Sequence, residues 1–205
     1  MDIEFKSSKN PVNYEKALKL LEKRVNEVKK GGRELVWFLE HPTTYTAGIR
    51  YKKEEILDKS INIVKTNRGG KITLHNPGQK IVYFVLDLNK RKKNIRNLVR
   101  EIENIIVEFL KIYRIKSYAD KKNIGVWVNR KKIAAIGIRV SRWVAYHGFS
   151  ININNNLDDY KKIVPCGLNN EKITSFKKEG KKSLNINKNL KNIFLKNLPK
   201  IWYFF

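Results

Sequence analysis

The sequence has few of the residues that build disulfide frameworks and metal sites, with one cysteine and three histidines in 205 residues. A single cysteine excludes an internal disulfide. Three histidines and one cysteine show no spacing typical of metal ligands. No apolar run approaches the roughly 20 residues that a membrane-spanning helix needs. The N-terminal segment MDIEFKSSKN is partly acidic and has no apolar stretch, unlike a secretory signal. We therefore expect a cytoplasmic protein without a bound metal.

Acidic residues are also scarce, since 19 Asp and Glu stand against 44 Lys and Arg for a net charge of +25. One explanation is an acidic partner, which could be nucleic acid, an anionic membrane surface or an acidic protein. The other is compositional drift, because the chain is rich in Lys, Asn and Ile, which AT-rich coding favours. Composition alone leaves both explanations open. The length suits one domain, residues 1–205, with a substantial core.

Hydrophobic periodicity predicts a mixed α/β domain. Apolar residues recur at helical spacing over 14–30 and 95–113, and a last helix is expected over 189–198. Short apolar runs predict strands, and the sequence of residues 41–50 indicates a loop. The predicted strands are 34–40, 61–67, 80–88 and 143–153, with a hairpin formed by 123–128 and 132–140.

The stretch RGGKITLHNPGQ, residues 68–79, makes a poor structural strand. Adjacent glycines let backbone N–H groups approach a ligand, and Arg68 suits a carboxylate, phosphate or carbonyl oxygen. No P-loop or Rossmann glycine pattern is present. The alternative is a pair of consecutive hairpin turns.

Two later stretches combine small side chains with polar ones. Lys132 begins a strand with almost no side-chain bulk around Ala135 and Gly137, which leaves room for a ligand. It can equally be a solvated lysine at a hairpin end. Gly148 interrupts the next strand, either as a bulge or as a ligand-facing gap. Its neighbour His147 is interpreted as a core histidine rather than a catalytic one.

The only cysteine, Cys166, lies between Pro165 and Gly167. A lone cysteine is often a small buried apolar residue. A Pro-Cys-Gly corner instead favours a turn that presents the thiol, as a nucleophile requires. No Gly-x-Ser-x-Gly elbow is present for a serine triad.

Taken together, four stretches resemble the motif series of the bacterial octanoyltransferases of lipoate biosynthesis. The resemblance covers about residues 36–176, and no family motif is found after about residue 180, which leaves the role of the tail at 180–205 open. It implies the biotin/lipoate-protein-ligase-like fold, in which a mixed sheet packs with helices. The stretches are EHPTTYTAG, RGGKITLHNPGQ, GVWVNRKKIAAIGIRVSRWVAYHGFSINI and VPCGLNNEKITS.

The resemblance also implies an activity and its residues. An octanoyl group moves from acyl carrier protein, through a thioester on Cys166, to a lysine of a lipoyl domain, and Lys132 lowers the pKa of the thiol. Asn76 stands where the family usually has glycine; asparagine suits a positive φ, but its side chain would narrow the mouth of the pocket. The implied substrate-binding residues are Arg68, Gly69, Gly70, Lys71, Ile72, Thr73, Leu74, His75, Ala135, Ile136, Gly137, Gly148, Phe149 and Ser150.

The implied partners are octanoyl-acyl carrier protein as donor, and the lipoyl domains of 2-oxoacid dehydrogenase complexes and the glycine cleavage H protein as acceptors. No cofactor is expected, and the chain is expected to be a monomer. One alternative is an ATP-dependent lipoate or biotin ligase on the same fold, for which Cys166 would not be needed. A second is a nucleic-acid-binding protein, although no aromatic residues are interleaved with the basic runs as stacking would require.

Overall fold

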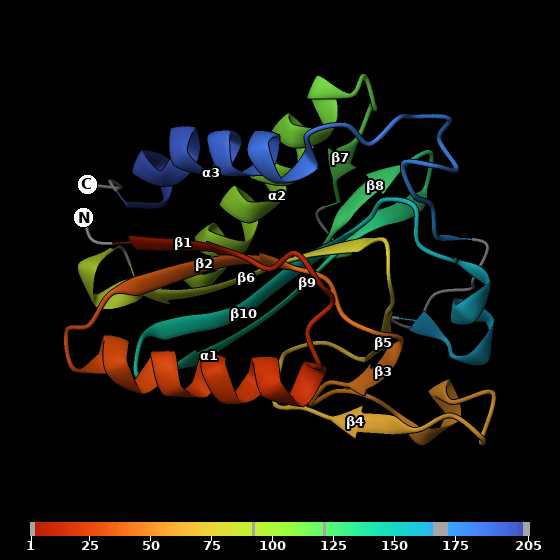
Figure 1. Ribbon diagram of the computed structural model, residues 1–205, viewed down its shortest axis with the longest axis horizontal. Coiled ribbons are helices and arrows are strands. Elements are labelled where there is room, and N and C mark those ends of the chain that lie inside the picture. The colour runs from red at the N-terminus through yellow and green to blue at the C-terminus, as the bar shows by residue number, and fades with distance from the viewer. Residues whose placement is uncertain (1–2, 92, 121, 166–171, 203–205) are drawn as a thin grey trace.

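The computed structural model describes residues 3–91, 93–120, 122–165 and 172–202. The described chain folds into two sheets and three α-helices (Figure 1). The helices are α1 (Tyr14–Lys29), α2 (Ile95–Ile112) and α3 (Ile186–Trp202), with short 3₁₀ helices η1 (Lys53–Glu55), η2 (Leu88–Lys90) and η3 (Asp158–Lys162). The strands are β1 (Ile3–Ser7), β2 (Glu34–Leu39), β3 (Thr44–Ala47), β4 (Ile63–Lys65), β5 (Ile72–His75), β6 (Gln79–Asp87), β7 (Tyr118–Ala119), β8 (Val126–Val128), β9 (Lys131–Ser141) and β10 (Val144–Asn152).

The large sheet has seven strands in the order β1-β2-β6-β10-β9-β8-β7. All neighbours in it are antiparallel except β1 and β2, which run parallel, so the sheet is mixed. The small sheet has the order β4-β3-β5, with β4 parallel and β5 antiparallel to β3. Gly69 connects the two sheets, since its N–H donates to the carbonyl of Ile138 in β9 at 3.3 Å.

Helices cover both faces of the large sheet, with α1 on one side and α2 and α3 on the other (Figure 1). The alternation of side chains along a strand divides the core accordingly. Leu35 and Trp37 of β2 pack with α1, whereas Val36 and Phe38 pack with the cluster that includes α2 and α3. None of the helices within the described ranges is long and apolar enough to cross a membrane.

The periodic segments were predicted correctly, and the short ones less well. Both long helices, the strands at 34–40, 80–88 and 143–153, the β8–β9 hairpin and the C-terminal helix are confirmed. The loop predicted at 41–50 was wrong, because it contains β3. The stretch 68–79 also contains a true strand, β5, and is not two consecutive turns. These two segments pair with each other over four residues, a non-local contact that local pattern does not reveal.

Candidate active site

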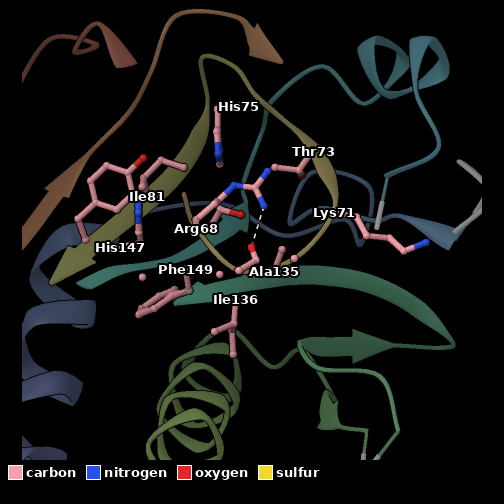
Figure 2. Close-up of a pocket in the computed structure, with 15 residues that line it drawn as sticks. Arg68, Lys71, Thr73, His75, Ile81, Ala135, Ile136, His147 and Phe149 are labelled. Atoms are coloured by element: carbon pink, nitrogen blue, oxygen red, sulfur yellow. Dashed lines mark hydrogen bonds between the residues drawn. The ribbon is translucent and has the colours of Figure 1, made fainter. Parts of the chain in front are cut away.

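A narrow cavity, here called the Arg68 cavity, lies between β5 and the strands β6, β9 and β10 (Figure 2). It has a volume of about 50 Å³ and mostly apolar walls. Twelve of the fourteen predicted substrate-binding residues line it. The lining residues are Arg68, Gly69, Gly70, Lys71, Thr73, His75, Ile81, Tyr83, Ala135, Ile136, Gly137, His147, Gly148, Phe149 and Ser150.

The two remaining predicted residues, Ile72 and Leu74, point the other way. Both side chains are fully buried in an apolar cluster with Tyr45 and Ile163, and neither lines the cavity. Alternate residues of a strand face opposite sides, so Thr73 and His75 face the cavity while Ile72 and Leu74 build the core beneath the small sheet. The structure therefore gives these two residues a packing position.

Gly148 is required by the approach of two strands. It is not a bulge, because β10 pairs with β6 and β9 through this position without a shift of register. A Cβ atom built on Gly148 would overlap the carbonyl oxygen of Val82. The glycine thus serves the pairing of β10 with β6 as well as the space beside the cavity.

Arg68 extends across the cavity, with His75 on one side and Ala135 on the other (Figure 2). Its guanidinium donates to the carbonyl and hydroxyl oxygens of Thr46, both at 2.9 Å, and to the carbonyl of Gly69 at 3.0 Å. The Nε atom is buried without a hydrogen-bond partner among the described residues. A cation so fixed at the wall of an apolar slot suits a ligand with a carbonyl or anionic oxygen. Lys71 points away from Arg68 (Figure 2) and forms an ion pair with Glu55 at 2.6 Å.

Two of the three histidines, His75 and His147, line this cavity, and the His41 ring lies against that of His75 with the ring centroids 5.6 Å apart. Burial lowers the pKa of His41 from 6.5 to about 4, and that of His75 and of His147 from 6.5 to about 3. The neighbouring Arg68 charge also lowers the pKa of His75 and His147. The imidazoles are therefore neutral near pH 7, and each has one donor and one acceptor nitrogen.

The hydrogen bonds assign these tautomers. His41 Nδ1 donates to the carbonyl of Val12 at 2.6 Å, so its Nε2 accepts from the Tyr83 hydroxyl at 2.8 Å. His75 Nδ1 donates to Gln79 Oε1 at 2.7 Å. His147 Nε2 donates to Asn67 Oδ1 at 2.8 Å.

A second, smaller cavity, here called the Lys132 cavity, adjoins the first. It has a volume of about 20 Å³, and it shares Thr73, Ala135 and Ser150 with the Arg68 cavity. Both Lys132 and Pro165 line it. The segment that precedes Cys166 is thus brought to the same small space as the predicted lysine.

Lys132 is half-buried. It donates a hydrogen bond to the carbonyl of Ile124 at 3.0 Å and lies 4.8 Å from the centroid of the Trp127 ring. The hydrogen bond lies in an exposed position, so the ammonium is held by the loop and also reaches solvent. The predicted nucleophile Cys166 lies outside the described residues.

The expectation for Asn76 was wrong in two respects. Its φ is not positive, since the positive φ of this turn belongs to Gly78, and it lines neither cavity. Its side chain is buried and donates to Asn156 O at 2.8 Å and to Asp159 Oδ2 at 2.9 Å. Asn76 therefore ties the turn to η3 and to the loop before it, and does not narrow the site.

Sequence reasoning missed three residues that line the Arg68 cavity: Ile81, Tyr83 and His147. Ile81 and Tyr83 lie in a strand buried throughout, where apolar composition does not distinguish a cavity wall from core. His147 was interpreted as a core histidine, and it is indeed 2% exposed. Its position beside Gly148 was the available signal that it also faces the cavity.

Comparison with known proteins shows the family. A model of the lipoyl protein ligase A/B catalytic domain matches residues 13–197. The chain is 47% identical over 185 residues to an octanoyltransferase of Ehrlichia chaffeensis, covering 87% of this chain and 86% of that protein. It is 41% identical over 206 residues to an octanoyltransferase of Wolbachia sp. subsp. Brugia malayi, covering 98% and 100%.

A solved structure shows the same fold at much lower identity. The bipartite lipoate protein ligase of Thermoplasma acidophilum, studied with its E2 lipoyl domain, superposes with a TM-score of 0.75 at 15% identity, covering 97% of this chain and 84% of that one. This likeness confirms the expected fold. The family match extends to residue 197, so it includes most of α3, where no family motif was recognised. The resemblance seen in the sequence is confirmed, and the chain belongs to the lipoyl protein ligase A/B catalytic domain family.

Proposed function

We propose that this chain transfers an octanoyl group from acyl carrier protein to a lysine of a lipoyl domain, through a thioester on Cys166. The octanoyltransferases that it resembles at 41–47% identity support the reaction class. The structural observation that supports this proposal is that the two cavities meet. Both are lined by Thr73, Ala135 and Ser150. The Lys132 cavity, which Pro165 also lines, therefore adjoins the apolar Arg68 cavity. This arrangement suits an apolar chain whose reactive end lies beside a cation.

The proposed reaction has two balanced steps. The Cys166 thiolate attacks the carbonyl carbon of the octanoyl thioester, and the carrier leaves as a thiolate that takes up a proton from the Lys132 ammonium. The ε-amine of the acceptor lysine then attacks the octanoyl-cysteine thioester, which forms an amide and regenerates the Cys166 thiol. Neither step needs ATP, because the acyl group arrives already activated as a thioester.

Lys132 has two roles in this proposal. An unperturbed cysteine has a pKa near 8.5 and is only a few per cent thiolate at pH 7. The Lys132 ammonium favours the thiolate in the first step. In the second step its neutral form accepts a proton from the attacking amine. The apolar walls of the Arg68 cavity bind the chain, and each buried CH₂ contributes about 0.8 kcal/mol.

The proposed acceptors are the lipoyl domains of 2-oxoacid dehydrogenase complexes and the glycine cleavage H protein. A lipoyl domain accompanies the Thermoplasma acidophilum ligase of the same fold, which supports this class of acceptor. The proposed working unit is the monomer. We place the reaction in the cytoplasm, where a free thiol stays reduced.

The test is a transfer assay with purified octanoyl-acyl carrier protein and an unmodified lipoyl domain. We expect the lipoyl domain to gain one octanoyl group without ATP, and we expect no gain with free octanoate, with or without ATP. Transfer that requires ATP and uses free octanoate would contradict the proposal and favour a ligase.

A further inference from the structure

Helix α2 carries a buried carboxylate, Glu103, on its sheet-facing side. Its side chain is 7% exposed and lies between the core residues Ile102 and Ile106 in sequence. Burying a carboxylate among apolar side chains is costly unless hydrogen bonds compensate. The partner that Glu103 has is a backbone group, the N–H of Gly125, at 2.9 Å from Oε1.

Gly125 belongs to a short loop between β7 and β8 that side chains hold in place. Asp120 accepts hydrogen bonds from the N–H groups of Lys122 at 2.8 Å and Asn123 at 2.7 Å. The indole of Trp127 donates to the carbonyl of Asn123 at 3.0 Å. These bonds hold residues 122–123 of the loop, and the Glu103 carboxylate of α2 binds Gly125 at its end.

The same peptide group contacts Lys132. The carbonyl of Ile124 and the N–H of Gly125 are the two ends of one peptide unit. The carbonyl accepts from Lys132 Nζ at 3.0 Å, and the N–H donates to Glu103 at 2.9 Å. One planar peptide thus joins a carboxylate to an ammonium, and hydrogen bonds in such a chain polarise and strengthen one another.

Gly125 has the conformation and size that this contact needs. Its φ is +127°, which side chains rarely adopt. A Cβ atom on it would lie 2.7 Å from the carbonyl oxygen of Ala134 and 3.1 Å from Lys132 Cε. The lysine stem therefore packs directly against the peptide that binds its ammonium.

We propose that Glu103 is a positioning residue for Lys132, acting through the Ile124–Gly125 peptide. This inference rests on the proposed function, in which Lys132 serves the Cys166 thiol. The peptide orients the ammonium over the Trp127 ring, and the carboxylate strengthens the carbonyl as an acceptor. Burial raises the pKa of Glu103, while the Gly125 N–H and Lys132 lower it and Asp120 raises it further.

The test compares Glu103→Ala, which removes the acceptor, with Glu103→Gln, which keeps an acceptor oxygen and removes the charge. We expect Glu103→Ala to lower kcat for octanoyl transfer by about tenfold, with the KM for the carrier little changed, as loss of transition-state alignment predicts. We expect a severalfold loss for Glu103→Gln. Glu101→Ala, two residues earlier and partly exposed on α2, is the matched control and should keep wild-type kcat.

A second readout separates positioning from a merely structural role. We expect the pH profile of thiol alkylation in Glu103→Ala to move toward that of Lys132→Ala. Adding Glu103→Ala to Lys132→Ala should cause no further loss of kcat, because the two act as a unit. Losses that multiply in the double variant, or wild-type kcat and an unchanged profile in folded Glu103→Gln, would overturn the positioning role. Full transfer activity of Lys132→Ala would overturn both the proposed function and the positioning role of Glu103. If Lys132→Ala loses transfer activity while both Glu103 variants behave like the wild type, only the positioning role of Glu103 is overturned.

Discussion

Gly137 of β9 and Gly148 of β10 lie directly opposite each other in their antiparallel pair, and both line the Arg68 cavity. Two glycines in register leave a part of the sheet without side chains beside the space proposed for the acyl chain. The two glycines differ in how well their surroundings would accept a side chain. A Cβ atom on Gly148 would overlap Val82, whereas one on Gly137 would lie 3.3 Å from the carbonyl oxygen of Gly69 and 3.4 Å from Arg68 Cδ. Gly137 is therefore the position at which the cavity can be narrowed without breaking the strand pairing.

Gly137→Ala should shift acyl-chain preference toward shorter chains. The added methyl group takes up space in a cavity of about 50 Å³, so we expect kcat/KM for the octanoyl donor to fall by about tenfold. Butanoyl-acyl carrier protein is the internal control, because its shorter acyl chain does not reach the part of the cavity beside Gly137. Equal losses for both donors, in a protein that remains folded, would show that this part of the cavity does not hold the chain.

Lys132→Arg should separate the two proposed roles of the lysine. Arginine keeps a positive charge but does not give up its proton near neutral pH, and its planar fork is larger than an ammonium. We expect Lys132→Arg to retain more of the low-pH thiol alkylation than Lys132→Ala, yet to transfer octanoyl groups poorly. Alkylation rates measured against pH, beside transfer rates, provide the comparison. An alkylation profile in Lys132→Ala that matches the wild type would mean that Lys132 does not set the thiolate.

The buried histidines should make stability fall in mild acid. Their pKa values are about 4, 3 and 3 in the folded chain, against 6.5 for the ordinary side chain. Below pH 6.5 the histidines of the unfolded chain therefore bind protons, whereas the buried histidines of the folded chain remain neutral. The contribution of these neutral histidines to the free energy of unfolding is fully present above pH 6.5 and is lost as the pH falls toward 4. At pH 5 the loss is about 2 kcal/mol for each histidine.

Urea unfolding at pH 7.5 and pH 5 measures this effect. His147→Asn is the informative variant, because asparagine tolerates the φ of +69° at this position and does not titrate. We expect its free energy of unfolding to fall by about 2 kcal/mol less than that of the wild type between the two pH values. The same pH dependence in both proteins would show that His147 is not held neutral.

The net charge of +25 should matter for the carrier and not for a small thioester. The proposed carrier donor is expected to be acidic, and opposite fields raise encounter rates. Salt weakens this steering, since the Debye length falls from about 10 Å at 0.1 M to about 3 Å at 1 M. We expect kcat/KM for octanoyl-acyl carrier protein to fall steeply with salt, and that for an uncharged octanoyl thioester to change little. Equal slopes would leave the charge as compositional drift, and strong competition by duplex DNA at physiological salt would support the nucleic-acid alternative.

The sequence predicted those parts of the fold whose pattern is local. Helices α1 and α2 have long apolar stripes, and β6 and β10 are long buried runs, so the local sequence pattern predicts each of these elements. The strands β3 and β5 have four residues each and exist because they pair with each other across more than twenty residues of chain. Such pairing depends on tertiary packing and leaves little trace in composition.

The site shows the same division. Motifs identified the segments that line the Arg68 cavity, but only the strand geometry of β5 separates Thr73 and His75 from the buried Ile72 and Leu74. Glu103 carried no signal, because it appears in the sequence as one more charged residue of an amphipathic helix. Its proximity to Lys132 arises only when α2 packs against the β7–β8 loop.

The proposed thioester on Cys166 is tested most directly by the mass of the protein after incubation with octanoyl-acyl carrier protein, without ATP and without an acceptor domain. We expect a mass increase of one octanoyl group, a peptide adduct on Cys166, and release of that adduct when a lipoyl domain is added. Cys166→Ser should show neither the thioester nor turnover. An adduct on another residue, or wild-type turnover in Cys166→Ser, would contradict the proposed thioester.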